Sequence, residues 1–118
     1  MVILLVLKVG SKLLMKKVKF ASTQWQRTKG LMFEDVKRFD YALVFDFEKE
    51  SKLMSSLHMI FVFFPIDVLF LDKSRKVVDK VTLEPFTPNY TPKKAAKYVI
   101  EMPKGKAKNA KIGNMASW

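Results

Sequence analysis

The apolar residues of this 118-residue chain occur in short, often alternating segments that turn-forming residues separate. The predicted strands are residues 2–9, 12–20, 42–47, 57–63, 66–71, 76–83 and 95–102. Gly10-Ser11 joins the first two strands and the polar turn 72–75 joins the fifth and sixth, so we expect two β-hairpins. Many short strands with turn signals between them are typical of a small antiparallel β-sandwich or a partly closed barrel.

Two short helices complete the predicted fold. Ser22 or Thr23 can cap a helix within residues 22–33, which Gly30 would end. A second, polar helix is predicted from Pro103 to about Lys111. No linker or internal repeat divides the chain, so residues 1–118 are expected to form a single domain.

Two of the predicted strands differ in how they should be buried. Residues 42–47 alternate between core-type and outward positions, which predicts a half-buried strand. Residues 57–63 are nearly all apolar, so both faces of that strand should be covered.

The composition excludes several kinds of chemistry. The chain has no Cys, which rules out disulfides, thiolate metal sites and cysteine nucleophiles. Its one histidine, His58, would need several carboxylates beside it to hold zinc, which is an uncommon ligand set. We therefore expect neither a metal nor a cofactor.

The N-terminal segment does not resemble a targeting signal. Residues 1–7 are apolar, but the positive charge of Lys8 follows them instead of preceding them. The run is also far shorter than the roughly 20 apolar residues that span a bilayer. We expect a cytoplasmic protein without a membrane span, and the sequence allows either Met1 or Met15 as its start.

The positive charge lies in two segments. Residues 8–19 carry five lysines and no acidic residue, and residues 93–111 carry seven lysines and one glutamate. Residues 20–92 hold ten basic and ten acidic residues, so the formal net charge of +11 arises from the two segments. If they converge, they form a basic face that could bind an anion. Lys outnumbers Arg 19 to 3, which favours a role in solubility and is also a tendency of thermophile proteins.

Four motifs occur in a recognisable order and spacing. They cover residues 30–33 (GLMF), 42–47 (ALVFDF), 64–72 (FPIDVLFLD) and 98–105 (YVIEMPKG). Together they resemble the domain-of-unknown-function 192 family, also called uncharacterised protein family 0127, over residues 18–114. The resemblance implies a compact, mainly β domain with short helices and no established activity. Its relatives typically carry Phe-Trp-Met-Lys-Asn-Thr before the proline motif, whereas residues 57–62 here are LHMIFV, as in the archaeal branch.

Three ionisable residues are candidates for a site. His58 could be a general base or a pH sensor, although a packed imidazole in an apolar strand with one hydrogen bond is favoured. Asp67 could be an acid with a raised pKa, although a structural acceptor of backbone N–H groups near Pro65 is favoured. Glu101 is expected on the outward face as an exposed partner for lysine.

Phe86 and Tyr90 lie in the proline-rich loop 85–92 and could either stack on a ligand or cover one end of the core. The leading hypothesis is a binding module without catalysis, with a crevice near Tyr90, Phe86 and His58 for a small or polymeric ligand. The absence of any recognisable catalytic motif favours this hypothesis over an enzyme.

Two alternatives remain open at this point, as does the oligomeric state. The first is weak, non-specific binding of nucleic acid or another anion through the segments 8–19 and 93–111, which requires the two to converge. Its candidate residues are Lys16, Lys17, Lys19, Lys93, Lys94 and Lys104. The second alternative is a small hydrolase that uses Asp67 and His58, which requires these two side chains to meet in one pocket.

Overall fold

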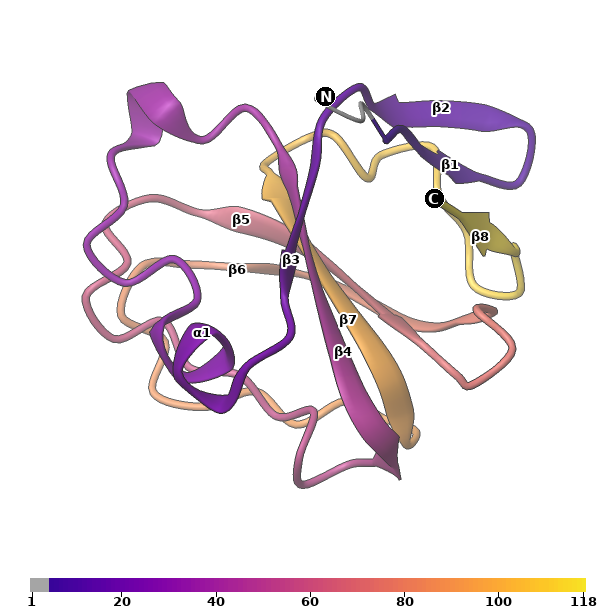
Figure 1. Ribbon diagram of the computed structural model, residues 1–118. Helices are drawn as coiled ribbons and strands as arrows, with labels where there is room; N and C mark the ends of the chain where they lie inside the picture. The colour runs from indigo at the N-terminus through magenta and orange to yellow at the C-terminus, as the bar shows by residue number, and fades with distance from the viewer. Residues whose placement is uncertain (1–4) are drawn as a thin grey trace.

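The computed structural model describes residues 5–118, which form two β-sheets with few helices (Figure 1). The larger sheet has the order β3 (Val18–Ala21), β4 (Ala42–Ser51), β7 (Ala96–Pro103), β5 (Ile66–Leu71) and β6 (Val77–Leu83). The smaller sheet has the order β2 (Lys12–Met15), β1 (Leu7–Val9) and β8 (Ala116–Ser117). The predicted mainly β fold is confirmed, but over residues 5–118 neither sheet closes into a barrel.

The larger sheet is mixed, not wholly antiparallel. β3 runs parallel to β4, whereas β4 with β7, β7 with β5, and β5 with β6 are antiparallel pairs. The parallel pair arises because the chain leaves the end of β3 through a helix and a long loop before it returns as β4.

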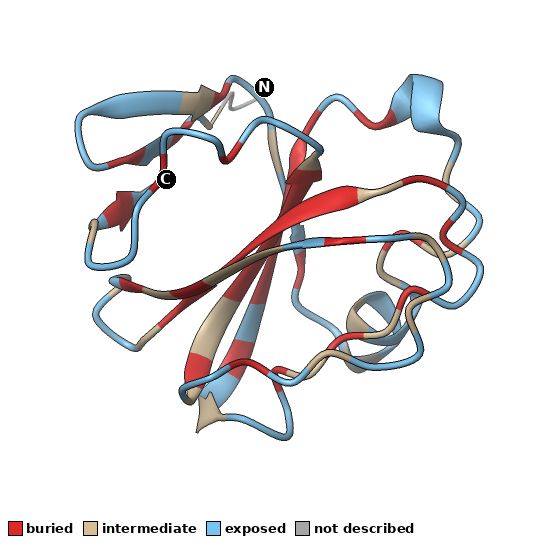
Figure 2. Ribbon diagram, turned by 180° about the vertical axis from the view of Figure 1, so that it is seen from behind, coloured by how far each residue is buried: buried red, intermediate tan, exposed pale blue. Residues whose placement is uncertain are grey.

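Both faces of the larger sheet are covered, and this arrangement positions the site. One face packs under the helix and loops, with Phe45, Val68, Phe70 and Val99 in its core. The other face packs against the smaller sheet and the chain that follows β7. Figure 2 shows the resulting concentration of buried residues on the central strands. We expected residues 42–47 to be buried on one face alone. This was wrong at Ala42 and Val44, whose side chains are buried in a second hydrophobic core, between the larger and the smaller sheet.

One of the two predicted hairpins is confirmed in full, and the other is confirmed in part. β5 and β6 form the expected hairpin from Ile66 to Leu83. β1 and β2 form the first part of the N-terminal hairpin, with Gly10 at φ +61° in the turn. Residues 18–20 of the predicted second strand were wrongly assigned to that hairpin, because they belong to the larger sheet as part of β3. Residues 2–4 of the predicted first strand lie outside the described residues.

The helix predicted within residues 22–33 is confirmed as the shorter α1 (Gln24–Lys29), and a 3-10 turn, η1, covers Val36–Arg38. The second predicted helix was wrong, because residues after Pro103 form turns and no regular helix. That segment is fixed by tertiary contacts instead: the Lys80 ammonium donates to the carbonyl oxygens of Lys108 and Ala110 at 3.3 and 2.8 Å.

The strand predicted at residues 57–63 was also wrong. This segment is a loop that touches the rest of the β structure through one isolated bridge, Leu57 with Tyr90. Met59 and Val62 point into the core, while Phe61 and Phe63 are 42% and 59% exposed. Its apolar residues serve to cover one face of the larger sheet, which a loop does as well as a strand.

Four exposed phenylalanines form a cluster on this side of the molecule. The rings of Phe33 and Phe61 stack with centroids 4.7 Å apart, and the ring of Phe86 meets those of Phe61 and Phe63 edge-on at 6.4 and 5.1 Å. The backbone at Phe33, Phe61 and Phe86 has φ values of 61°, 57° and 62°, a conformation that side chains with a Cβ rarely adopt.

Within residues 5–118, no helix has both the length and the apolar character required to cross a membrane.

Candidate functional site

A cleft opens between α1 and the segment 54–58, with β4 as its floor. Its outer part is a groove of about 540 Å³ that includes Phe47, Glu48 and Met54 in its lining. Its inner part is a cavity of about 60 Å³ that ends at Glu101. The two parts share six lining residues and are therefore continuous: Arg27, Thr28, Phe45, Ser56, Leu57 and His58.

The sequence places α1 beside this cleft through a capping box. The Thr23 hydroxyl accepts a hydrogen bond from the Gln26 N–H at 3.1 Å, and the Gln26 side chain accepts one from the Thr23 N–H at 3.2 Å. These bonds satisfy N–H groups that lack partners at a helix start, so the chain turns into a helix at Gln24. Arg27 ties the helix to β4 because its guanidinium donates to the Asp46 carbonyl oxygen at 3.3 Å.

Gly30 ends α1 and lies against the inner cavity. Its backbone has φ +47° and ψ −124°, a combination that glycine tolerates far better than other residues. A Cβ at this position would stand 3.4 Å from the ring of Phe45 and 3.7 Å from Oε1 of Glu101. Both are ordinary van der Waals distances, so the positive φ, and not crowding, favours glycine at this position of the GLMF motif.

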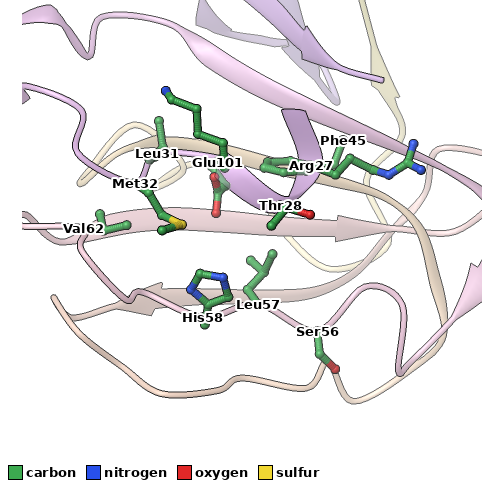
Figure 3. A pocket seen from close by; sticks show the side chains of 12 residues that line it. Arg27, Thr28, Leu31, Met32, Phe45, Ser56, Leu57, His58, Val62 and Glu101 are labelled. Carbon is green, nitrogen blue, oxygen red and sulfur yellow. The ribbon is translucent and has the colours of Figure 1, made fainter. Parts of the chain in front are cut away.

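Glu101 is the central residue of the site. It lies on β7, opposite Leu43 of β4 and Val68 of β5, and so points into the core under α1. Its side chain is 4% exposed. Among the described residues, Oε1 of Glu101 has no hydrogen-bond partner. Figure 3 shows the carboxyl group directed into the space between α1 and the segment that carries Leu57 and His58.

The expectation that Glu101 is an exposed partner for lysine was wrong. β7 is a central strand with covered faces, so the alternation of its sequence does not separate core from solvent. Burial away from water disfavours the charged form and raises the pKa of Glu101 to about 8. At neutral pH this residue is mainly a neutral carboxylic acid.

His58 lines both parts of the cleft and is half-buried. Its Nδ1 accepts a hydrogen bond from the Ile60 N–H at 3.2 Å. A neutral imidazole bonded in this way carries its proton on Nε2, which makes that atom a donor. The favoured interpretation, a packed histidine with one hydrogen bond, agrees with the contact, although the ring lines a cleft instead of lying within a strand.

Asp67 lies on the opposite face of the larger sheet from Glu101. It follows Ile66 and precedes Val68 on β5, and its partner on β7 is Met102, whose side chain belongs to the second core. His58 and Asp67 therefore do not meet, and the proposed hydrolase pair was wrong.

The contacts of Asp67 show a structural role. Its Oδ2 accepts hydrogen bonds from the N–H groups of Gly105 and Ala107 at 2.9 and 3.1 Å, and its Oδ1 accepts one from the Thr82 hydroxyl at 2.8 Å. The predicted acceptor of backbone N–H groups is thus present, but it fixes the turn after β7 and not the chain break at Pro65.

Tyr90 and Phe86 do not line the cleft near His58. The Tyr90 hydroxyl donates to Oδ2 of the buried Asp79 at 2.7 Å, and its ring packs against Phe70. Burial and this hydrogen bond to Asp79 raise the pKa of Tyr90 to about 12. Phe86 is 49% exposed and belongs to the phenylalanine cluster. The crevice is therefore displaced from the predicted loop toward α1.

The two lysine-rich segments place lysines on one shared groove. Lys16, which follows β2, and Lys106 of the turn after β7 line the same groove of about 510 Å³. Lys104, also exposed, lies in this turn. Lys93 and Lys94 precede β7, and its eight residues separate them from the turn by about 25 Å at roughly 3.3 Å per residue.

Two other candidate lysines, Lys17 and Lys19, interact with neighbouring side chains. Lys17 forms an ion pair with Asp40 at 2.6 Å, and both side chains are more than half exposed, so the pair adds little stability. The Lys19 ammonium lies 4.1 Å from the ring centroid of Tyr41. Neither residue lines the groove that Lys16 shares with Lys106.

Asp79 is a buried residue that sequence reasoning did not select as functional. Its carboxylate accepts from the Tyr90 hydroxyl, the Lys93 N–H at 3.1 Å and the Lys80 N–H at 2.8 Å. These contacts fold the loop 84–95 back over the sheet. Over residues 5–118, no cluster of three or more His, Asp or Glu side chains could hold a metal ion.

The fold and cleft define a class: a mainly β domain with a surface cleft that ends at a buried carboxyl group. The chain belongs to the DUF192 family (Uncharacterized ACR), whose model matches residues 5–117, a wider region than the motifs at 18–114 suggest.

Archaeal relatives carry the same family name, UPF0127 protein. The one from Thermococcus sibiricus is 42% identical over 98% of this chain and 74% of its own length. The one from Thermococcus kodakarensis is 44% identical over 86% of this chain and 64% of its own length, so this chain spans less than two thirds of that protein.

Solved structures share the fold. A protein of unknown function from Novosphingobium aromaticivorans superposes with a TM-score of 0.81 at 18% identity, over 98% of this chain and 85% of that one. At this identity the likeness shows the fold alone.

Proposed function

We propose that this protein is a small-ligand-binding module and that its site is the cleft that ends at Glu101. The observation that carries the proposal is the unpartnered Oε1 of Glu101, which is buried beside a cavity of about 60 Å³. Buried polar atoms in folded proteins nearly always have hydrogen-bond partners. An orphan acceptor beside an open space is therefore best explained by a ligand that enters the space.

The energetics support a group that donates a hydrogen bond. A buried polar atom left without a partner costs about 1–3 kcal/mol, and a donor from a ligand recovers that free energy. Because the pKa of Glu101 is raised to about 8, the carboxyl group is mainly neutral at pH 7 and can itself donate through its own proton. The site therefore suits a small neutral group that both donates and accepts, such as an amide or a hydroxyl.

The residues around Glu101 also favour a small neutral ligand. His58 brings its Nε2 proton to the cleft, and Arg27 brings a guanidinium to the outer groove. Leu57, Phe45 and Val62 supply the apolar part of the lining. A concave site that combines apolar walls with a few converging polar groups is the usual form of a small-molecule site.

Acetamide and acetone provide a matched pair of probes, because they have similar shapes but only acetamide donates hydrogen bonds. In amide NMR spectra of the full chain, acetamide should shift the signals of Gly30, Leu57 and His58 at millimolar concentration, and acetone should shift them less. Glu101→Leu should abolish the response to acetamide, and Glu101→Gln should preserve it. Equal responses to both probes, or a response that survives Glu101→Leu, would count against the site.

The second function we propose is weak anion binding in the groove between β2 and the turn after β7. The observation that favours it is the position of Lys16 and Lys106 on one groove. If it operates, affinity for a mixed single-stranded RNA should fall steeply as salt rises, because lysines release counterions from phosphates. The double variant Lys16→Ala/Lys106→Ala should flatten this salt dependence, and the control Lys93→Ala/Lys94→Ala should not. Equal effects of the two variants would remove this groove as the site.

A further inference from the structure

We propose that the cleft catalyses proton transfer on a small, neutral α-hydroxy carbonyl compound, with Glu101 as the base and His58 as the hydrogen-bond donor to the carbonyl oxygen. This inference rests on the proposed function, because it assigns a substrate class and a reaction to the same cleft. It is carried by the placement of two complementary groups, a buried carboxyl group and a neutral imidazole, on one small cavity.

Glu101 and His58 reach this cavity from different elements. Glu101 comes from β7, in the middle of the larger sheet, and His58 comes from the loop that covers that face of the sheet. Both side chains line the inner cavity, and His58 also lines the outer groove. Figure 3 shows the Glu101 carboxyl group and the His58 ring facing the same space. A small molecule that enters this space therefore meets both groups.

The hydrogen bonding of His58 suits it to hold a carbonyl oxygen. Its Nδ1 accepts from the Ile60 N–H at 3.2 Å, so the neutral ring carries its proton on Nε2. An N–H group directed at a carbonyl oxygen stabilises the negative charge that develops there when a proton leaves the neighbouring carbon. A neutral imidazole does this without giving up its own proton.

The surroundings of Glu101 suit it to take the proton from carbon. Oε1 has no hydrogen-bond partner within residues 5–118, so no bond to the protein breaks when it accepts a proton. Burial raises the pKa of Glu101 to about 8, which makes its ionised form a stronger base than an ordinary carboxylate. The apolar part of the lining limits the access of water to this base: Leu31, Met32, Phe45, Leu57 and Val62.

The two groups define the substrate class. A hydroxyl on the α carbon can donate to the unpartnered Oε1 of Glu101, and this bond brings the C–H of the same carbon to the carboxyl group. The carbonyl oxygen on the next carbon then accepts from Nε2 of His58. The inner cavity of about 60 Å³ admits only a small head group, and hydroxyacetone, with three carbons, is a suitable probe.

The proposed step needs no second reactant. The C–H bond of the α carbon breaks, and its proton forms an O–H bond with the Glu101 carboxylate. The electron pair of the broken bond becomes the C=C bond of an enediolate, and the π electrons of the carbonyl group move to the oxygen that His58 holds. When a proton returns from Glu101 to the same carbon, the substrate and the carboxylate are both restored. In heavy water the carboxyl proton exchanges with solvent, so the carbon gains deuterium.

Deuterium exchange into hydroxyacetone measures this step in the full chain. Proton NMR in heavy water follows the hydroxymethyl and methyl signals separately. We expect the hydroxymethyl group to exchange at least about tenfold faster with the wild type than with Glu101→Gln, because a general base contributes about 10²–10⁴-fold. The methyl group also lies next to the carbonyl group but carries no hydroxyl, so its exchange should be similar in the two proteins.

The variants separate the cleft from the rest of the protein. Glu101→Gln keeps the shape of the side chain and every lysine, so it measures the exchange that lysine amines cause through Schiff bases. His58→Leu removes the donor and should slow the exchange at least about tenfold. His58→Gln keeps an N–H donor and should slow it less. Amide NMR spectra of each variant confirm that it is folded.

The pH dependence identifies the base. The difference in rate between the wild type and Glu101→Gln should rise up to about pH 8 and then level off, because only the ionised carboxylate accepts a proton. The other ionisable groups that line the cavity or interact with Glu101 are shared by both proteins: Arg27, Lys29, His58 and Tyr41. A difference that stays constant from pH 6 to pH 8 would overturn the inference.

The remaining outcomes distinguish this inference from the proposed function. If hydroxyacetone shifts the amide signals of Gly30, Leu57 and His58 but exchanges equally with the wild type and Glu101→Gln, the cleft binds a ligand without catalysis. The inference alone is then wrong. If neither hydroxyacetone nor acetamide shifts these signals, the proposed function is wrong as well. Equal acceleration at the methyl and hydroxymethyl groups would assign the exchange to lysine amines and would also overturn the inference.

Discussion

Gly30 crosses Glu101 so closely that a Cβ on the glycine would lie 3.7 Å from the carboxyl oxygen Oε1. The two residues come from different elements, the end of α1 and the centre of β7. Both residues line the inner cavity. We therefore expect the lining of the cavity beside Glu101 to depend on this glycine.

Gly30→Ala tests this dependence. We expect it to destabilise the protein by about 1–3 kcal/mol, because the backbone conformation at φ +47° is strained for alanine. The new methyl group would stand beside the inner cavity, 3.7 Å from Oε1 of Glu101. Urea unfolding measures the change. Gly105→Ala is the control: φ is +92° there, but a Cβ would meet nothing within 4 Å. Both variants carry backbone strain, but only Gly30→Ala should also alter the acetamide response. A full acetamide response in Gly30→Ala would contradict the proposed contact.

The stability of the protein should fall between about pH 4.5 and pH 8 through Glu101. The unfolded chain loses this proton near the ordinary pKa of 4.5, whereas the folded protein keeps it until about 8. Over that window the folded state binds more protons, so each rise in pH favours the unfolded state, by several kcal/mol in total. Urea unfolding at pH 5, 7 and 9 measures the slope.

Glu101→Gln supplies the control for this pH dependence, because glutamine has a similar shape and does not titrate. The variant should resemble the wild type at pH 5 and be the more stable protein at pH 9. Other groups, such as Glu34, whose pKa is lowered by a hydrogen bond from Tyr41, act the same way in both proteins. Parallel stability curves for the two proteins would show that Glu101 does not contribute.

Asp67→Asn should destabilise the protein without affecting the cleft. The substitution weakens the acceptor that holds the N–H groups of Gly105 and Ala107, at a cost of about 1–3 kcal/mol. Hydrogen exchange should show the loss at these two amides first. Because Asp67 lies on the other face of the sheet, the acetamide response at Gly30 and His58 should persist. A lost response in a folded variant would mean that the two sites are coupled.

Tyr90→Phe should loosen the loop 84–95. It removes the hydrogen bond to the buried Asp79, and we expect a loss of about 1 kcal/mol because Asp79 keeps two backbone donors. Urea unfolding gives the size of the effect. Tyr98→Phe, in which the tyrosine ring packs on Trp118 instead, is the comparison. If the two variants lose equal stability, the Tyr90–Asp79 bond has no special part in holding the loop.

The sequence was sufficient where local patterns decide the structure. The hairpin β5–β6 has two segments rich in apolar residues around a polar turn, and Thr23 carries the signature of a helix cap. Both features depend on neighbours a few residues apart. The prediction of a mainly β fold followed from the repetition of such patterns.

The sequence was insufficient where topology decides burial. Glu101 has Lys97 and Lys104 as near neighbours, so local reasoning places it at the surface, but β7 pairs on both sides and is covered on both faces. Residues 57–63 are apolar because they cover a sheet, and composition alone does not distinguish a covering loop from a buried strand. The turn after β7 depends on Asp67, which lies 38 residues before Gly105.

The most direct test of the central claim is a carbon NMR titration of the Glu101 carboxyl group in the folded protein between pH 3 and pH 10. A buried, unpartnered acid at the end of the cleft should titrate with a midpoint near 8. Glu48, which is exposed on the rim of the groove, serves as the internal reference. A midpoint for Glu101 near 4.5 would mean that water or a charged partner reaches this carboxyl group. Glu101 would then be charged at neutral pH, and the proposed site for a small neutral ligand would be wrong.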